Sequence, residues 1–494
     1  MNSSPTSASL YLAIDQGGHA SRAAVFDHAG NMVARACQPI SETRPRAGWV
    51  EQDPLGLLAS VRRCVAAVAN RLEDRWRDVR CAGLATQRAS VCCWDRENGA
   101  PLTPVLSWQD RRAHEWLDAL GADAAMIRAR TGLMLSAHYG ATKLRWCLDH
   151  LPAARTAQRR QRLGCGPLAT FLLRQLLHEH GEYIDPANAS RTLLWNIESG
   201  EWDPRLLALF GIAREVLPMT VPTRFDFGHL VHDQQRIPLT VVTGDQSAAV
   251  FAWGAPRNDT VYINIGSGAF VSWLTHESPP QHDRLLHSVV YRDTRTTWSA
   301  LEGTVNGAAT AIDVVARQLG RDPQHVLDAL PGWLDTVKSP PLFLNTVSGL
   351  GAPWWVPDLS ERFIGGGDVA ARMVAVVESI AFLTTVIVEE LCRVQPGIAR
   401  IMTSGGLAKL GGLCSRLATL CELPVERPAE SEATARGLAC LLAGCPDSWR
   451  SANHATVFAP VPDSALQSRY ARWRENLETA IAEHRSQGGP SPEN

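Results

Sequence analysis

Short apolar runs alternate along the chain with longer stretches whose apolar residues recur at helical spacing. Residues 10–14 and 23–26 are apolar and flank a polar tip, which predicts two strands joined by a tight connection. Residues 57–72 and 371–391 carry apolar side chains on one stripe each, which predicts two amphipathic helices. This alternation of strands and helices is typical of an α/β fold.

The opening pattern of strand, glycine-bearing polar tip and strand returns once, at residues 260–274. A single repeat at this distance indicates two similar lobes rather than a solenoid. We therefore expect an N-terminal lobe over residues 1–252 and a C-terminal lobe over 253–482. The last stretch, 483–494, is polar and rich in Gly, Pro and Ser, so we expect a disordered tail there.

Composition narrows the class of protein. The 494 residues are 45% hydrophobic and 20% charged, with a formal net charge of −2, which is ordinary for a globular protein and does not indicate nucleic acid or an anionic membrane as a partner. The first residues lack a signal-peptide pattern, and no long apolar run indicates a membrane span. The 12 scattered cysteines indicate reduced, mostly buried thiols. We expect a cytoplasmic protein.

The first polar tip carries candidate chemistry. Asp15 ends the first apolar run, and Gly17 and Gly18 follow it. A carboxylate at a strand end can hold Mg²⁺ beside phosphate, and glycines let backbone N–H groups approach phosphate oxygens. The alternative is a tight hairpin with a capping acid, and this stretch alone does not decide between the two.

Two further stretches have similar potential. Asp245 follows the apolar run 237–242, so it is a candidate general base at a strand end or, equally, a helix N-cap. Gly405 and Gly406 separate an apolar run from a helix-like segment, within residues 402–420. Such a junction suits a nucleotide, although many α/β turns have the same pattern.

Taken together and in order, these stretches resemble the FGGY family of carbohydrate kinases, and most closely its glycerol kinase branch. The resemblance runs from about residue 9 to 445 and rests on nine stretches: DQGGHASRAAVFD, GWVEQDP, PVLSWQDRR, ATKLRW, DPANASRTLLWNI, TGDQSAAVF, NIGSGAF, SGLGAPWWVPD and SGGLAKL. It implies two actin-like (ribonuclease H-like) lobes with an ATP and substrate cleft between them. It also implies transfer of the ATP γ-phosphoryl group to a hydroxyl of a small polyol or sugar.

The resemblance assigns roles to individual residues. Asp245 corresponds to the base that takes the hydroxyl proton, Asp15 to the acid associated with Mg²⁺, and Arg22 to the arginine near the phosphates. The residues expected around ATP or ADP are Gly17, Gly18, His19, Arg22, Gly266, Ser267, Gly307, Gly405 and Gly406. The residues expected around the substrate are Arg88, Trp108, His138, Asp245, Gln246 and Phe270. A homo-oligomer is also compatible with this family.

The chain departs from the glycerol kinase pattern at the first polar tip. Gly18, His19 and Ala20 stand where two threonines and a serine are usual, so three hydroxyl donors are missing. His19 offers a replacement N–H donor to phosphate or is a solvated loop residue. Ala311 and Leu410 also replace polar residues. These losses leave open a catalytically weak sugar-binding or regulatory protein on the kinase fold.

The substrate pocket departs as well. Ala89 replaces the glutamate that usually follows the arginine, and His138 replaces a tyrosine. Because a site built to bind hydroxyls discriminates through its polar groups, we expect a substrate other than glycerol, or else a tolerant glycerol kinase with weaker binding. A generic actin-like ATPase is disfavoured, since Arg88, Trp108 and Phe270 together indicate a small-molecule pocket.

Overall fold

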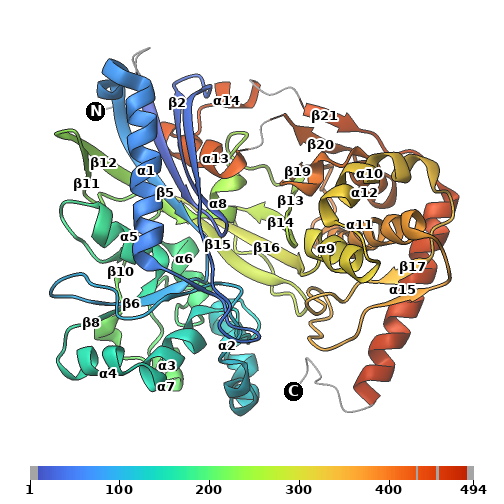
Figure 1. Ribbon diagram of the computed structural model, residues 1–494, viewed down its shortest axis with the longest axis horizontal. Helices are drawn as coiled ribbons and strands as arrows, with labels where there is room; N and C mark the ends of the chain where they lie inside the picture. The colour runs from blue at the N-terminus through green and yellow to red at the C-terminus, as the bar shows by residue number, and fades with distance from the viewer. Residues whose placement is uncertain (1–8, 430–431, 452–454, 487–494) are drawn as a thin grey trace. The chain divides into compact units, whose positions relative to one another are not determined.

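A computed structural model describes residues 9–429, 432–451 and 455–486 (Figure 1). They form two compact units. Unit 1 contains the described residues up to Pro256, the segment Ser288–Ser299 and the described residues of Glu432–Ala452. Unit 2 contains the other described residues. Each unit combines sheets with helices, so the predicted α/β class is confirmed.

Unit 1 is built around a six-stranded sheet with the order β11-β12-β5-β1-β2-β3. Its strands are β1 (Leu10–Gln16), β2 (Ala20–Asp27), β3 (Met32–Pro39), β5 (Val79–Thr86), β11 (His229–His232) and β12 (Gln235–Gly244). Strand β1 pairs antiparallel with β2, which confirms the hairpin predicted from the two apolar runs. Strands β1, β5 and β12 are parallel, so their carboxyl ends meet at one edge of the sheet.

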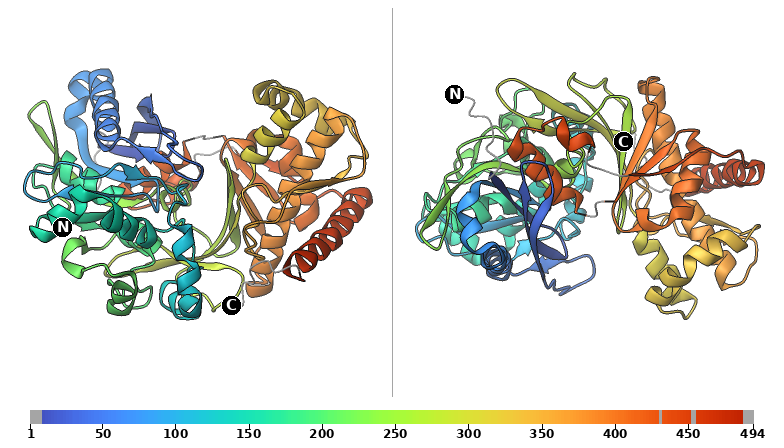
Figure 2. Two further views of the ribbon diagram at one scale, coloured as in Figure 1. Left: turned by 60° about the horizontal axis from the view of Figure 1, so that its bottom comes forward. Right: turned by 90° about the horizontal axis from the view of Figure 1, so that it is seen from above.

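Helices cover both faces of this sheet. Helix α1 (Pro54–Leu72), the first helix predicted from periodicity, packs on β1, β2 and β3. Helix α13 (Ala433–Ala443) packs on β1, β2 and β5 and against the short helix α8 (Asp245–Ala249). Figure 2 shows α1 and α13 on opposite sides of the sheet. The return of α13 to this sheet explains why residues after 432 belong to unit 1.

The rest of unit 1 consists of small sheets and helices. A four-stranded sheet has the order β4-β7-β6-β8, and β9 pairs with β10. These strands are β4 (Glu51–Gln52), β6 (Val91–Asp95), β7 (Val105–Leu106), β8 (Leu163–Pro167), β9 (Tyr183–Ile184) and β10 (Met219–Thr220). The helices are α2 (Ala124–Thr131), α3 (Gly140–His150), α4 (Pro152–Arg159), α5 (Leu168–Leu176), α6 (Pro186–Ala189), α7 (Pro204–Phe210) and α14 (Ser448–Ser451).

Unit 2 carries a seven-stranded sheet with the order β15-β16-β14-β13-β19-β20-β21, and a separate pair, β17 with β18. The strands are β13 (Thr260–Ile265), β14 (Ala269–Thr275), β15 (Leu286–Arg292), β16 (Thr297–Val305), β17 (Leu342–Leu344), β18 (Arg362–Ile364), β19 (Arg400–Ser404), β20 (Val425–Pro428) and β21 (Ala455–Phe458). The antiparallel hairpin of β13 and β14 is the predicted repeat of the first hairpin. The far end of the β15–β16 hairpin, Ser288–Ser299, belongs to unit 1.

Helices pack around the sheet of unit 2. They are α9 (Ala309–Gln318), α10 (Pro323–Thr336), α11 (Val369–Val394), α12 (Gly411–Cys421) and α15 (Ser464–Ser486). Helix α11, the second helix predicted from periodicity, contacts α9, α10, α12 and β14. It is long and apolar enough to cross a membrane, but 89% of its most apolar window is buried. Its composition is that of the central helix of a protein core.

The structure bears on the expected domain boundary, the expected tail and the expected state of the cysteines. We expected one boundary, after residue 252. The two compact units have more than one boundary, because the Ser288–Ser299 segment and α13 belong to unit 1. Helix α15 extends to Ser486, so the first four residues of the expected tail are helical and the remainder lies outside the described residues. All 12 cysteines are free thiols, and only Cys37 is exposed.

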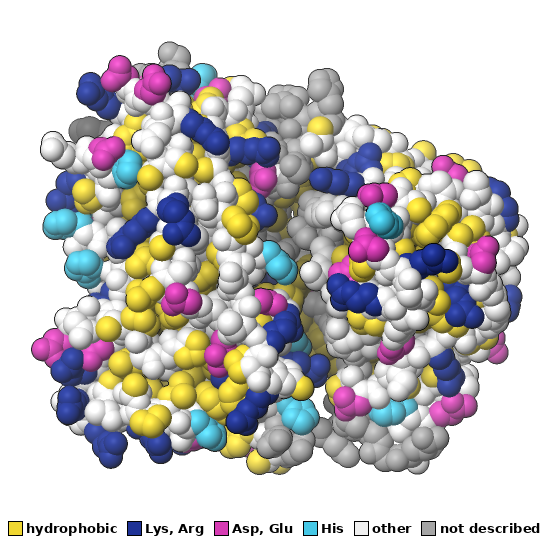
Figure 3. All heavy atoms as spheres, in the orientation of Figure 1, with side chains coloured by type: hydrophobic (Ala, Val, Ile, Leu, Met, Phe, Trp, Pro, Cys, Tyr) yellow, Lys and Arg dark blue, Asp and Glu magenta, His cyan; other side chains and the backbone are white. Residues whose placement is uncertain are grey.

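The surface visible in Figure 3 carries basic and acidic side chains intermixed. This distribution accompanies the small net charge of −2. The expectation that nucleic acid is not a partner rests on charge alone and stays a prediction.

The contact between α13 and α8 leads to a stability prediction. A Cβ atom on Gly437 of α13 would lie 1.8 Å from the carbonyl oxygen of Ala248 in α8. Gly437→Ala must therefore separate the two helices, and we expect a loss of about 1–3 kcal/mol in the free energy of unfolding. Denaturant unfolding measures this loss.

The matched control is Gly332→Ala, in helix α10. A Cβ atom there meets no described atom within 4 Å. This substitution should be neutral or should stabilise by up to about 1 kcal/mol, because alanine favours the helix. Equal stability of both variants would contradict the tight packing of α13 on α8.

Candidate active site

The parallel strands of unit 1 bring three sequence-predicted residues to one edge of the sheet. Gln16 of β1 and Gly244 of β12 both pair with Thr86 of β5. Asp15, Arg88 and Asp245 each lie within two residues of this common level. The carboxyl ends of parallel strands are where α/β proteins usually bind ligands.

Asp15 is a buried carboxylate with one unused oxygen. It is 5% exposed, and its Oδ2 lies 3.4 Å from Nη1 of Arg22. Among the described residues, none donates a hydrogen bond to its Oδ1. Burial raises the pKa of Asp15 to about 7; Arg22 lowers the pKa, while Asp245 and Glu432 raise it. A cation placed at Oδ1 would relieve this concentration of negative charge.

Arg22 connects Asp15 with a carboxylate that sequence reasoning missed. Its Nε lies 3.4 Å from Oε2 of Glu432, just before helix α13, and Glu432 also lies 3.7 Å from Nη1 of Arg35. Glu432 follows Arg22 by more than 400 residues, and nothing in the local sequence around either residue indicates this pair. The side chain of Arg22 is still 35% exposed, so it retains N–H groups for a further anionic partner.

Asp245 is the first residue of α8 and is not its N-cap. Gly244 occupies the N-cap position, and Oδ1 of Asp245 accepts a hydrogen bond of 2.7 Å from the backbone N–H of Gln246. Burial raises the pKa of Asp245, while the charges of Arg88 and Arg191 lower it. Gly244 thus occupies the N-cap position, while the Asp245 side chain still accepts one backbone N–H of the first turn, so the role of Asp245 as a base stays a prediction.

Arg88 lies across the backbone that precedes Asp245. A Cβ atom on Gly244 would come within 2.4 Å of the Arg88 Cδ, so the glycine provides the space that the arginine stem occupies. Arg88 itself is 9% exposed. Glycine at position 244 thus has a specific packing reason, which the sequence alone did not reveal.

The polar tip between β1 and β2 forms a tight turn. The N–H of Gly17 donates to the carbonyl of Ala20 across 3.1 Å, and the side chain of His19 is exposed. A Cβ atom on Gly18 would lie 3.4 Å from Nε1 of Trp108. Gly18 therefore lies beside the predicted substrate residue Trp108, whereas a phosphate contact by His19 stays a prediction.

A chain of buried polar side chains runs from this turn to Trp108. Gln52 Nε2 donates to the carbonyl of Gly18 across 3.0 Å, and Gln87 Nε2 donates to Oε1 of Gln52 across 2.9 Å. Ser90 Oγ then donates to Oε1 of Gln87, and the backbone N–H of Trp108 donates to Ser90 Oγ. The sequence has a polar patch at residues 86–88 between two apolar runs, but it does not indicate which distant side chains join this hydrogen-bonded series.

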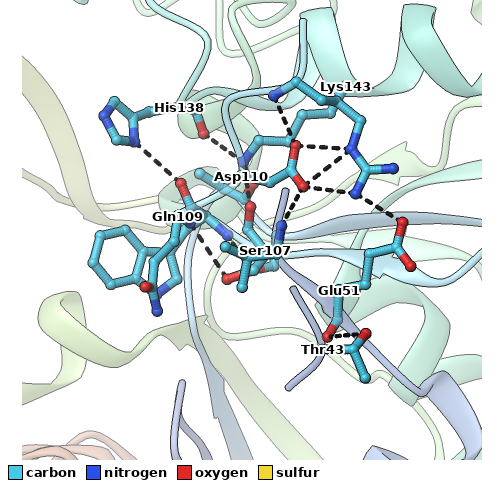
Figure 4. A network of polar contacts seen from close by, with 12 residues as sticks. Thr43, Glu51, Ser107, Gln109, Asp110, His138 and Lys143 are labelled. Atoms are coloured by element: carbon cyan, nitrogen blue, oxygen red, sulfur yellow. Dashed lines mark hydrogen bonds and ion pairs between the residues drawn. The ribbon is translucent and has the colours of Figure 1, made fainter. Parts of the chain in front are cut away.

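His138 also contacts the Trp108 segment. Its Nδ1 lies 3.1 Å from the carbonyl oxygen of Trp108, so Nδ1 carries the proton of this hydrogen bond and Nε2 remains an acceptor (Figure 4). Burial lowers the pKa of His138 to about 4; the Trp108 carbonyl raises the pKa, and Lys143 and Arg111 lower it. The ring is therefore neutral near pH 7.

The predicted nucleotide residues of unit 2 lie together. The N–H of Ala309, in the first turn of α9, donates to the carbonyl of Gly266, and the N–H of Ala308 donates to the carbonyl of Ser267. Gly307 immediately precedes Ala308, and a Cβ on it would lie 2.7 Å from the carbonyl of Val347. These contacts fix the β13–β14 turn against the start of α9.

Backbone packing requires glycine at position 405 but not at position 406. Gly405 has a φ of +92°, and a Cβ on it would lie 2.5 Å from the carbonyl of Ile265, so backbone packing requires glycine. Gly406 faces open space among the described residues. A 3₁₀ turn, Leu407–Lys409, follows before α12 begins at Gly411, so the expected strand–glycine–helix junction contains an additional turn.

The remaining predicted substrate residues divide between the units. Gln246 follows Asp245 in α8 of unit 1, and Phe270 lies on β14 of unit 2. Unit 1 thus holds Arg88, Trp108, His138, Asp245 and Gln246. The assignment of Phe270 to the same site stays a prediction.

Comparison with known proteins bears on the family of the chain. The family model for the N-terminal domain of the FGGY family of carbohydrate kinases matches residues 10–252, and the model for its C-terminal domain matches residues 261–444. The chain is 35% identical to a glycerol kinase of Alkalilimnicola ehrlichii, over 95% of this chain and 98% of the relative. It is 34% identical to a glycerol kinase of Trichlorobacter lovleyi, over 98% and 100%.

Solved structures share the fold. A Plasmodium falciparum glycerol kinase with ADP superposes with a TM-score of 0.82 at 23% identity, covering 96% of this chain and 98% of that chain. A xylulose kinase of Rhodospirillum rubrum superposes with a TM-score of 0.82 at 20% identity, covering 97% and 99%. With both domain models matched in order and the relatives aligned over nearly their full length, the chain belongs to the FGGY family of carbohydrate kinases.

Proposed function

We propose that this carbohydrate kinase transfers the γ-phosphoryl group of ATP to a hydroxyl group of a small polyol or sugar, with Asp245 as the general base. The observation that carries the proposal is the common edge of β1, β5 and β12, where Asp15, Arg88 and Asp245 lie. The glycine-rich turns of unit 2 are candidates for the nucleotide. Phosphoryl transfer needs mainly positioning and charge neutralisation, which these residue types can supply.

Asp245 suits the role of base. As the hydroxyl oxygen bonds to the γ-phosphorus, the bond from that phosphorus to the β,γ-bridging oxygen breaks and ADP leaves. The hydroxyl proton passes to a carboxylate oxygen of Asp245. Burial raises the pKa of Asp245, which strengthens it as a base, while Arg88 and Arg191 limit the rise and keep the carboxylate available.

Asp15 is the residue we propose to hold Mg²⁺. Its unused Oδ1 and its raised pKa fit a site for a hard cation. Among the described residues, no cluster of three or more His, Cys, Asp or Glu side chains forms a metal cage. A single carboxylate is compatible with Mg²⁺, which usually retains waters and shares substrate phosphates. When bound, the cation would neutralise phosphate charge beside Arg22.

The acceptor is proposed to be larger than glycerol or differently substituted. Ala89 stands where glycerol kinases have a glutamate, directly after Arg88, and its side chain has no polar group. His138 stands where they have a tyrosine, and its neutral ring offers Nε2 to a substrate hydroxyl. The pocket then has fewer polar side chains that would be left unpaired without the hydroxyls of a small triol. A cytoplasmic location, a homo-oligomer and the absence of nucleic-acid or membrane partners stay predictions.

Substitution of the base tests the mechanism. Asp245→Asn is nearly isosteric but cannot take the proton, so kcat should fall by about 10²- to 10⁴-fold while KM for the acceptor changes little. Steady-state kinetics with an acceptor that the wild type uses measure this effect. The control is Asp233→Asn, at an exposed turn position with a φ of +46°, which asparagine tolerates. An Asp245→Asn variant as active as this control would refute the assignment.

Acceptor preference tests the pocket. We expect a lower kcat/KM for glycerol than for the best four- to six-carbon polyol or sugar, because two usual glycerol partners are missing. Ala89→Glu should shift this ratio toward glycerol by about 10-fold or more, the scale of one hydrogen bond to a charged group. Ala89→Gln, of equal size without charge, is the control. Glycerol as the best wild-type acceptor would contradict the proposed pocket.

A further inference from the structure

Lys143 is a buried cation that the proposed reaction does not use. It lies in the first turns of α3 and is 0% exposed. Both burial and a position near a helix N-terminus disfavour a positive charge. Burial and the charge of Arg112 lower the pKa of Lys143, while Asp110 raises it. Because burial lowers the pKa of Lys143 to about 7, its positive charge depends on contacts that compensate for the burial.

Three carbonyl groups surround the ammonium group. Nζ donates to the carbonyl oxygen of Ala89 at 3.0 Å, of Ser107 at 2.7 Å and of His138 at 2.8 Å (Figure 4). A lysine ammonium has three N–H donors, so each donor has one acceptor. We call these three carbonyls with Nζ of Lys143 the carbonyl cage.

Each carbonyl of the cage belongs to a different segment of the candidate substrate pocket. Ala89 directly follows Arg88, Ser107 directly precedes Trp108, and His138 is itself a predicted substrate residue. These segments are the β5–β6 connection, the residues directly after β7 and the loop before α3. Two further hydrogen bonds connect the same segments in pairs: the backbone N–H of Trp108 donates to Ser90 Oγ, and His138 Nδ1 donates to the Trp108 carbonyl.

The surroundings hold the cage in place. Asp110 is 0% exposed and accepts hydrogen bonds from Arg112 at 2.7 Å and from the backbone N–H of Val50 at 2.7 Å. The Arg112 guanidinium lies 4.0 Å from the ring centre of Trp49 and bonds Glu51 at 2.8 Å. The negative Asp110 thereby offsets the buried charge of Lys143 without occupying its donors.

We propose that Lys143 is a positioning residue for the acceptor, which sets the relative placement of Arg88, Trp108 and His138 through the carbonyl cage. The inference rests on the proposed function, because these three side chains are assigned to the acceptor there. Lys143 acts through the backbone and does not touch the substrate. Its loss should therefore weaken acceptor binding more than ATP binding.

Two variants of Lys143 and one matched control test the proposal. Lys143→Met keeps the side-chain length but removes all donors, and Lys143→Gln keeps two N–H donors. The control is Arg436→Met. Arg436 is also a buried cation, 4% exposed, and it also donates to three carbonyls, those of Gly30, Ala252 and Trp449, but none belongs to a predicted substrate residue.

Steady-state kinetics give the first readout. Lys143→Met should raise KM for the acceptor by about 10- to 100-fold, the scale expected for loss of hydrogen bonds to a charged group, and change KM for ATP by less than about threefold. Lys143→Gln should give a smaller rise. Arg436→Met should lower thermal stability without this selective rise. Equal changes in both KM values, or the same kinetics in Lys143→Met and Arg436→Met, would overturn the proposal.

Amide hydrogen exchange of the ligand-free protein gives the second readout, and it needs no activity. Exchange at residues 88–90, 106–109 and 137–139 should accelerate in Lys143→Met and stay unchanged in Arg436→Met. Unchanged exchange at these residues would contradict the proposed role of the carbonyl cage. If the wild type phosphorylates no acceptor, the proposed function fails while this readout still decides the role of Lys143. Failure of both Lys143 variants to fold beside a folded Arg436→Met would also overturn a positioning role.

Discussion

The site in unit 1 depends on the common level at which β1, β5 and β12 end. Gln16 of β1 and Gly244 of β12 both pair with Thr86 of β5. All three strands therefore end at the same level of the sheet. A slip of one residue in any of these registers would turn the following side chain to the opposite face. Helix α13 stabilises this edge from one side, since Gly437 lets it contact α8 directly. Asp15 lies on β1 itself, and the ends of β5 and β12 determine where Arg88 and Asp245 begin the segments that follow.

Near this edge several charged side chains are buried, and each is partly neutralised by a neighbour of opposite charge. Asp15 lies between Arg22 and the negative charges of Asp245 and Glu432, which leaves an excess of negative charge for a cation to neutralise. Lys143 and Asp110 offset each other, and Arg112 joins Asp110 to Glu51. Buried charges of this kind contribute little net stability compared with apolar packing. They do determine geometry, because each hydrogen bond accepts only a narrow range of positions.

The sequence predicted those features that depend on short-range periodicity. The two hairpins, helices α1 and α11 and the α/β class follow from apolar spacing. The strand-end positions of Asp15 and Asp245 made them candidates, and the resemblance assigned their roles. The sequence could not predict contacts between distant segments, such as Glu432 with Arg22, Gln52 with Gln87, or Lys143 with three carbonyls. It also could not decide which residue occupies the N-cap position of α8, where the structure has Gly244 and not Asp245. The return of α13 to unit 1 depends on tertiary packing that no local pattern encodes.

The central claim is that the protein makes a phosphate ester from ATP and a hydroxyl group of a polyol or sugar. Phosphorus NMR of the full chain with ATP, Mg²⁺ and individual polyols or sugars tests it most directly. The account predicts that loss of the γ-phosphate signal is matched by a new phosphomonoester signal and by ADP, with at least one acceptor. Release of inorganic phosphate alone, or intact ATP with every acceptor of the panel, would contradict it.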